Sequence, residues 1–221
     1  ITDYFFTTSR IANKNLETFG VHKNNIYFVG NVMIDTLLKK ESSFKQPDVW
    51  KTLHLKPQDY FVLTLHRPSN VDQEGHFEKI LSQIIISSQG KPIIFPVHPR
   101  TRKVIERLHL KYSNVHFVEP LSYLEFNYLV KYAFAVLTDS GGITEEATVL
   151  NVPCITFRDS TERPETCEIG TNVLVGSSLA KIEDAFKTLF SEKWKKGKSP
   201  ELWDGKTSVR IVEQLIKIYN L

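Results

Sequence analysis

The chain has 221 residues, 41% of them hydrophobic, which is enough to bury a complete core. Its 28 basic and 25 acidic residues are spread along the chain and leave a net charge of +3, so nucleic acid is not expected as a partner. No apolar run approaches the length of a membrane span, and Cys154 and Cys167 form neither a C-x-x-C motif nor a disulfide framework. We therefore expect a soluble protein with reduced thiols, located in the cytoplasm and without a membrane partner.

Short apolar segments alternate along the chain with segments of helical periodicity. The strand candidates are Tyr4–Thr7, Ile26–Val29, Tyr60–Leu65, Ile93–Val97, Val115–Val118, Ala135–Thr138, Cys154–Phe157 and Asn172–Val175. The helix candidates are Ser9–Phe19, Val32–Lys40, Asp72–Ser88, Thr101–Leu110, Tyr123–Tyr132, Ile143–Leu150 and Ala180–Phe190. This alternation predicts an α/β fold, a doubly wound parallel sheet with helices on both faces.

Local signals refine the ends of these elements. Asn31 and Ser122 stand where the N-cap of a helix would be, and Gly20 and Gly90 follow helix candidates. The polar, proline-bearing segment Trp50–Asp59 is the best candidate for an internal linker.

Polar residues follow several strand candidates directly. His66, His98, Glu119 and Ser140 each stand just after the end of a predicted strand. Because ligands of parallel sheets bind at the carboxyl ends of the strands, we expect these residues to share one rim of the domain.

The segment Thr138–Ala147 (TDSGGITEEA) ends a strand candidate and opens a helix. The glycines of Ser140–Gly142 let an anion approach the backbone, and the dipole of the helix favours negative charge at its N-terminus. Glu145 and Glu146 lie about one turn further in, where carboxylates can accept hydrogen bonds from sugar hydroxyls. The motif therefore indicates a diphosphate joined to a ribose, although a plain helix-opening turn would have the same residues.

Six further motifs accompany this segment. They are Val29–Asp35 (VGNVMID), Leu63–Asp72 (LTLHRPSNVD), Phe95–Pro99 (FPVHP), Pro153–Glu165 (PCITFRDSTERPE), Glu168–Gly176 (EIGTNVLVG) and Pro200–Ile211 (PELWDGKTSVRI). In this order and spacing they resemble the UDP-N-acetylglucosamine 2-epimerase family, in its non-hydrolysing form, from about Tyr4 to Ile216.

The resemblance implies a Rossmann-like domain, the C-terminal domain of the two-domain GT-B architecture. Residues 1–40 then correspond to the end of the N-terminal domain and the connection between domains. Residues 41–200 would be the C-terminal UDP-binding domain, and residues 201–221 a C-terminal helix that packs back toward the N-terminal domain. The Gly-Thr-Arg-Pro-Glu type motif of the family's first domain is absent, so we expect this chain to be the C-terminal half, with half of the active site missing.

The resemblance also assigns roles to two histidines. His66 matches a histidine that lies at the substrate and affects catalysis, and a histidine can donate to a phosphate or shuttle a proton near neutral pH. On its own, His66 could equally be a rim residue that caps a strand end. His98 matches a histidine beside a second UDP-N-acetylglucosamine that acts as an effector in bacterial members, so it is a possible effector-binding residue.

The substrate-binding residues that the resemblance implies are Arg67, Phe126, Ser140, Gly141, Gly142, Glu146 and Arg163. The serine and the glycines would hold the diphosphate, Glu146 the ribose hydroxyls, and Phe126 the uracil ring. Phe126 could instead pack its helix with Leu129 and Val130, at spacings i+3 and i+4. Arg158 and Arg163 could likewise form salt bridges with Glu162 or Glu165.

The implied activity is the interconversion of UDP-GlcNAc and UDP-ManNAc, by elimination and re-addition of UDP through 2-acetamidoglucal, for cell-envelope polysaccharide. This half would hold the UDP leaving group, while the carboxylates that move the proton belong to the family's N-terminal domain, so the chain alone should be inactive. The alternatives are a hydrolysing 2-epimerase, an epimerase of a modified UDP-sugar, or a GT-B glycosyltransferase. The resemblance further implies a homodimer of the full-length enzyme, and we expect neither a cofactor nor a metal, because no metal-ligand motif is present.

Overall fold

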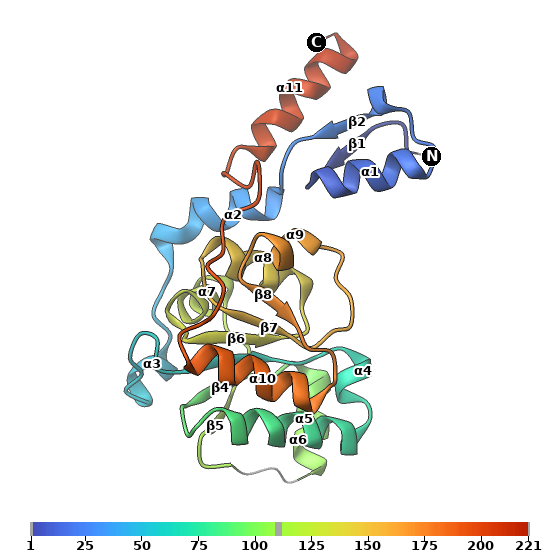
Figure 1. Ribbon diagram of the computed structural model, residues 1–221. Helices are drawn as coiled ribbons and strands as arrows, with labels where there is room; N and C mark the ends of the chain where they lie inside the picture. The colour runs from blue at the N-terminus through green and yellow to red at the C-terminus, as the bar shows by residue number, and fades with distance from the viewer. Residues whose placement is uncertain (1, 109–111, 221) are drawn as a thin grey trace. The chain divides into compact units, whose positions relative to one another are not determined.

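The computed structural model describes residues 2–108 and 112–220, without the side chains of residues 99 and 100. The chain forms two compact units. Unit 1 comprises Ile1–Ser42 and Ser199–Leu221, and unit 2 comprises Ser43–Lys198 (Figure 1). Every residue to which the sequence analysis assigns a role at a ligand lies in unit 2.

Unit 1 is built on a two-stranded parallel sheet. Its elements are β1 (Phe5–Thr7), α1 (Arg10–Thr18), the 3₁₀ helices η1 (Lys23–Asn25) and η2 (Glu41–Ser43, which runs into unit 2), β2 (Ile26–Phe28), α2 (Val32–Lys40) and α11 (Thr207–Tyr219). Asn31 is the N-cap of α2, as predicted, because its side chain accepts a hydrogen bond of 3.0 Å from the backbone N–H of Met33. Gly20 follows α1 with φ of 84°, the left-handed conformation that ends many helices.

Unit 2 contains a parallel sheet of six strands. They are β3 (Phe61–Thr64), β4 (Ile93–Pro96), β5 (Val115–Val118), β6 (Ala135–Thr138), β7 (Cys154–Thr156) and β8 (Asn172–Leu174). Their order in the sheet is β5-β4-β3-β6-β7-β8, so the chain winds outward from β3 to one edge, returns to the middle at β6 and winds to the other edge. This topology confirms the predicted doubly wound α/β fold. It also places the switch point, where ligands of such sheets bind, between β3 and β6.

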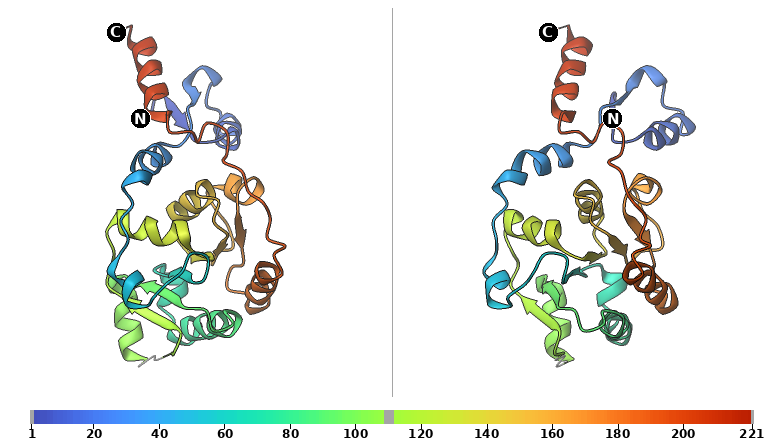
Figure 2. Two further views of the ribbon diagram at one scale, coloured as in Figure 1. Left: turned by 90° about the vertical axis from the view of Figure 1, so that its left-hand side faces the viewer. Right: turned by 60° about the vertical axis from the view of Figure 1, so that its left-hand side comes forward.

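Helices cover both faces of this sheet (Figures 1 and 2). They are α3 (Asp48–Thr52), α4 (Pro68–Val71), α5 (Glu74–Ser87), α6 (Pro99–Arg107), α7 (Tyr123–Tyr132), α8 (Gly141–Val149), α9 (Pro164–Glu168) and α10 (Leu179–Phe190). Phe61 and Leu63 point to the apolar cluster under α5, α6 and α10, whereas Tyr60 and Val62 point to the cluster under α3, α7 and α8. Strands buried on both faces explain the continuous apolar runs in the sequence.

The predicted linker at Trp50–Asp59 is wrong. The Trp50 ring packs edge-on against the rings of Tyr60, Tyr128 and Tyr132, with centroids 5.5, 5.3 and 6.0 Å away. The segment therefore belongs to the core of unit 2, because Trp50, Leu53 and Leu55 pack in one of its apolar clusters. The boundary between the units falls at residues 42 and 43 instead.

Other differences concern short helices. The short helices α3, α4 and α9 were not predicted, and α4 and α9 each have proline at the first position, where the missing N–H costs nothing. The helix predicted for 101–110 begins at Pro99, and residues 109 and 110 lie outside the described part of the chain. Within residues 2–108 and 112–220, we find no helix that has both the length and the apolar character needed to cross a membrane.

Candidate functional site

The loops that follow β3 and β6 meet at the switch point through one buried side chain, Asp139. Its carboxylate is fully buried and accepts hydrogen bonds from the backbone N–H groups of His66 and Arg67, the latter at 2.9 Å. The Asn70 amide donates to the same carboxylate at 3.0 Å. Burial acts to raise the pKa of Asp139, but the hydrogen bonds from His66, Asn70 and Arg67 outweigh it and hold the pKa below its ordinary value. Asp139 is thus ionised at neutral pH.

His66 stands at this junction with its ring half-exposed. Its Nδ1 lies 2.9 Å from Oδ1 of Asp139, and 41% of its side chain remains accessible. The ring centroid of His98 is 5.9 Å from that of His66. The structure therefore brings together the two histidines that the sequence analysis placed on one rim.

Arg67 is held at the same junction by its side chain. Its Nε donates to the backbone carbonyl of Asp139 at 2.9 Å. Together with Arg158 it lines a cavity of about 210 Å³, beside Asn70 and the loop after β7. Asp159 lines the same cavity, so two guanidinium groups and a carboxylate border it.

The N-terminus of α8 is open. Ser140 is its N-cap, but the Ser140 side chain makes no capping hydrogen bond to any described residue. A Cβ built on Gly142 would meet no described atom within 4 Å, and one on Gly141 would meet only ordinary contacts, the nearer being Nη1 of Arg158 at 3.8 Å. The described surroundings therefore do not require glycine at these two positions. The positive end of the helix dipole and the uncapped N–H groups suit an anion.

Glu146 lies one turn into α8 and is 5% exposed. Burial is the main cause that raises its pKa, and neighbouring Glu145 adds to it, whereas hydrogen bonds with Tyr123 and Asn127 act in the opposite direction. Burial and the contact with Glu146 also raise the pKa of the Tyr123 hydroxyl. The carboxylate is thus oriented by α7, against which α8 packs on this face.

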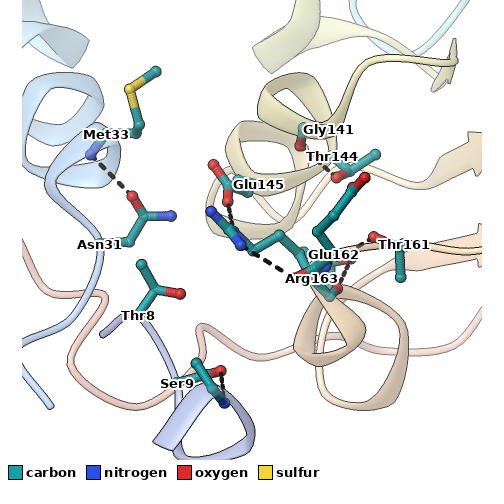
Figure 3. A network of polar contacts seen from close by, with 12 residues as sticks. Thr8, Ser9, Asn31, Met33, Gly141, Thr144, Glu145, Thr161, Glu162 and Arg163 are labelled. Atoms are coloured by element: carbon teal, nitrogen blue, oxygen red, sulfur yellow. Dashed lines mark hydrogen bonds and ion pairs between the residues drawn. The ribbon is translucent and has the colours of Figure 1, made fainter. Parts of the chain in front are cut away.

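Arg163 reaches from the loop before α9 to α8, where its guanidinium forms an ion pair with Glu145 (Figure 3). Glu145 is 5% exposed, so Arg163 balances a buried charge. The sequence analysis proposed Glu162 or Glu165 as the partner of this arginine, and the structure gives Glu145 instead. The two residues are far apart in sequence, and no local pattern joins them.

Arg158 forms the salt bridge that the sequence analysis considered. Its guanidinium donates two hydrogen bonds to the Glu162 carboxylate, at 2.7 and 2.6 Å. This contact with Arg158 is the main cause that lowers the pKa of Glu162 to about 2. The pair lies beside Gly141, where a built Cβ would be 3.8 Å from Nη1 of Arg158.

Phe126 on α7 is half-buried and packs against the apolar cluster that contains Leu129 and Val130. The packing interpretation from the sequence is therefore confirmed, and part of the ring stays accessible. Ser122 caps α7, as predicted, in a capping box with Glu125. Among the residues that the structure describes, no group of three or more His, Cys, Asp and Glu side chains is placed to hold a metal ion.

A model of the UDP-N-acetylglucosamine 2-epimerase family matches residues 1–216. The chain belongs to this family. The α/β fold with its parallel sheet agrees with solved structures of the family, which have the GT-B architecture.

Two related sequences and one solved structure show how far the similarity extends. The UDP-N-acetylglucosamine 2-epimerase of Methanocaldococcus jannaschii is 41% identical over 225 residues, covering 97% of this chain and 61% of the relative. The crystal structure of Methanocaldococcus jannaschii UDP-GlcNAc 2-epimerase in complex with UDP-GlcNAc and UDP superposes with a TM-score of 0.85 at 40% identity, covering 97% of this chain and 61% of that one. The UDP-2,3-diacetamido-2,3-dideoxy-D-glucuronate 2-epimerase of Pseudomonas aeruginosa is 36% identical, covering 99% and 61%. The chain thus spans 61% of the length of these relatives.

Proposed function

We propose that unit 2 binds UDP with its diphosphate at the N-terminus of α8, and that the protein acts as a UDP-N-acetylglucosamine 2-epimerase. The observation that carries the proposal is the uncapped start of α8, with Gly141 and Gly142 open and His66 held beside it at the switch point. A helix N-terminus of this kind attracts phosphate through its free N–H groups and its dipole. A relative at 40% identity was crystallised with UDP-GlcNAc and UDP.

The roles of the other side chains follow from their positions. Glu146 is buried close to the start of α8, where its carboxylate can accept hydrogen bonds from the ribose hydroxyls. The accessible part of Phe126 would flank the uracil. Arg67 supplies positive charge at the rim, whereas Arg163 can reach the ligand only by sharing its guanidinium with Glu145. His98 remains a proposed contact for a second nucleotide-sugar.

The chemistry explains why a leaving-group site is needed. The C2 proton of the sugar is weakly acidic, because C2 is not next to a carbonyl. In the proposed route a base takes this proton, the bond between C1 and the diphosphate oxygen breaks, and UDP departs with the electron pair, which leaves 2-acetamidoglucal. UDP then adds back to C1, and a proton delivered to C2 from the opposite face gives the 2-epimer. The negative charge that develops on the departing diphosphate is stabilised by the N–H groups of α8 and by His66.

In this proposal the chain supplies the leaving-group half of the reaction. The carboxylates that move the C2 proton lie in the N-terminal domain of the family, outside the residues of this chain. The homodimer and the cytoplasmic location that the resemblance implies stay proposals of the same kind.

The relative from Pseudomonas aeruginosa supports a second candidate, an epimerase of a modified UDP-sugar. Both candidates release UDP, so the residues described above serve either. Turnover of UDP-GlcNAc and of UDP-2,3-diacetamido-2,3-dideoxy-D-glucuronate by the whole enzyme distinguishes them.

Calorimetric titration of the chain with UDP tests the binding proposal. We expect a single site whose affinity falls about tenfold or more, or ~1.4 kcal/mol, in Glu146→Ala, because the ribose loses its acceptor. Glu183→Ala, which removes an exposed carboxylate on α10, is the matched control and should bind as wild type does. Equal affinity of wild type and Glu146→Ala would refute the ribose assignment, and no binding by wild type would refute the site.

A further inference from the structure

The two oxygens of the buried Asp139 carboxylate have different surroundings. Oδ2 accepts three hydrogen bonds, from the backbone N–H of His66 at 3.0 Å, from that of Arg67 at 2.9 Å, and from the Asn70 amide at 3.0 Å. Oδ1 faces the His66 ring, with Nδ1 at 2.9 Å, and the His66 backbone N–H only at 3.2 Å. One oxygen therefore holds the loop, and the other is directed at the imidazole.

This arrangement fixes the proton of the ring. An ionised carboxylate can only accept hydrogen bonds, so Nδ1 of His66 must be the donor. The neutral ring then carries its proton on Nδ1 and its lone pair on Nε2. A histidine with one nitrogen engaged in this way presents the other to its ligand in a defined tautomer.

We propose that Asp139 is the positioning residue for His66: its carboxylate accepts the hydrogen bond from Nδ1–H, so Nε2 is the nitrogen that takes up a proton and donates it to the departing diphosphate. The inference rests on the proposed function for the identity of the ligand, but the orientation of the ring stands on the geometry alone. Asp139 also directly precedes Ser140, the N-cap of α8. Asp139 thus links the position of the His66 ring to that of the N-terminus of α8.

The substitution Asp139→Asn separates this role from a merely structural one. A carboxamide has a single acceptor oxygen, and the three donors around Oδ2 will draw that oxygen to their side. The NH₂ group then takes the place of Oδ1 and faces Nδ1 of His66 as a donor. Nδ1 of the ring must then accept this hydrogen bond through its lone pair, so the proton of the neutral ring moves to Nε2.

The ¹⁵N chemical shifts of the neutral ring, measured on the labelled chain, report the tautomer directly. His66→Gln identifies the two resonances by removing them. In wild type we expect the protonated, pyrrole-like shift at Nδ1, and in Asp139→Asn we expect the two nitrogens to exchange their shifts. If the same tautomer dominates in both proteins, the positioning role is overturned.

Asn70→Ala is the matched control. It removes a donor from the same buried carboxylate but leaves the contact between Oδ1 and Nδ1 untouched. Asn70→Ala should destabilise the loop and keep the wild-type tautomer. Destabilisation of the loop alone should therefore not produce the exchange of shifts expected for Asp139→Asn. Should Asp139→Asn not fold, the wild-type spectrum decides by itself, because a proton on Nε2 in wild type contradicts the proposal.

Titration of the same samples with UDP keeps this inference distinct from the proposed function. Wild type that shows the Nδ1 tautomer but binds no UDP would support the positioning of His66 and refute the ligand. UDP binding by wild type together with the exchanged shifts in Asp139→Asn would support both.

Discussion

At the scale of single residues, the sequence indicated which side chains matter more readily than it indicated their partners. His66 and Ser140 could be placed on one rim because each follows an apolar strand. Asp139 directly precedes Ser140 in its motif. Nothing in the local sequence, however, distinguishes a carboxylate that binds another loop from one that faces solvent. Its partners lie in the loop after β3 and on α4, distant in sequence, and the pairing of β3 with β6 brings them to Asp139.

The contact set of Asp139 predicts how stability depends on pH. Its pKa lies below the ordinary value, so the folded state binds the proton less tightly than the unfolded state. The stabilisation is therefore complete above the unfolded pKa of about 3.9 and is lost as the pH falls through the folded pKa. At neutral pH we expect Asp139→Asn to lower the free energy of unfolding by about 1–3 kcal/mol.

Denaturant titrations at pH 7 and at a series of acidic pH values measure this effect. The difference between wild type and Asp139→Asn should shrink as the pH falls below about 4. Asp184→Asn, on the exposed face of α10, serves as the control and should change the free energy of unfolding little. A difference for Asp139→Asn that is the same at every pH would show that ionisation of this carboxyl does not stabilise the fold.

At the scale of elements, hydrophobic periodicity was sufficient for the strands and for the long helices of unit 2, whereas α11 was expected only from the resemblance. Each predicted strand is present, and the central strands of the six-stranded sheet leave unbroken apolar runs because they are buried on both faces. The segment around Trp50 was misjudged because its contacts, with Tyr60 and with α7, are tertiary. The order of the strands lay beyond the sequence pattern, which shows alternation but not which strands become neighbours.

At the start of α8, a substitution of Gly142 is expected to affect stability and UDP affinity differently. Gly142 has open space around its Cα, so Gly142→Ala should leave the free energy of unfolding unchanged or raise it by at most about 1 kcal/mol. UDP affinity should nevertheless fall about tenfold or more, because the new methyl group occupies the approach of the diphosphate to the backbone. Thermal or denaturant unfolding and calorimetry on the same protein measure the two quantities.

Gly75 provides a close control within the chain. It is the second residue of α5, as Gly142 is of α8, and a Cβ at Gly75 also meets no described atom within 4 Å. Gly75→Ala should have the same small effect on stability and none on UDP affinity. If Gly142→Ala binds UDP as well as Gly75→Ala does, the diphosphate does not lie at the start of α8.

At the scale of the whole molecule, the division of the chain determines what each part can do. Unit 2 has its own sheet, two apolar clusters and the switch-point loops, so it contains everything that we assign to UDP. The chain spans 61% of its relatives, and the proposed route takes the proton-transferring carboxylates from outside it. The central claim is therefore one of binding, namely that unit 2 holds UDP at the junction of β3, β6 and α8.

Amide shifts of the ¹⁵N-labelled chain during titration with UDP test that claim most directly. We predict saturable changes in amide chemical shift. The largest should fall on Ser140, Gly141, Gly142 and His66, with the amides of unit 1 little affected. A saturable change with its largest shifts elsewhere, or no change at UDP concentrations that saturate relatives of the family, would contradict it.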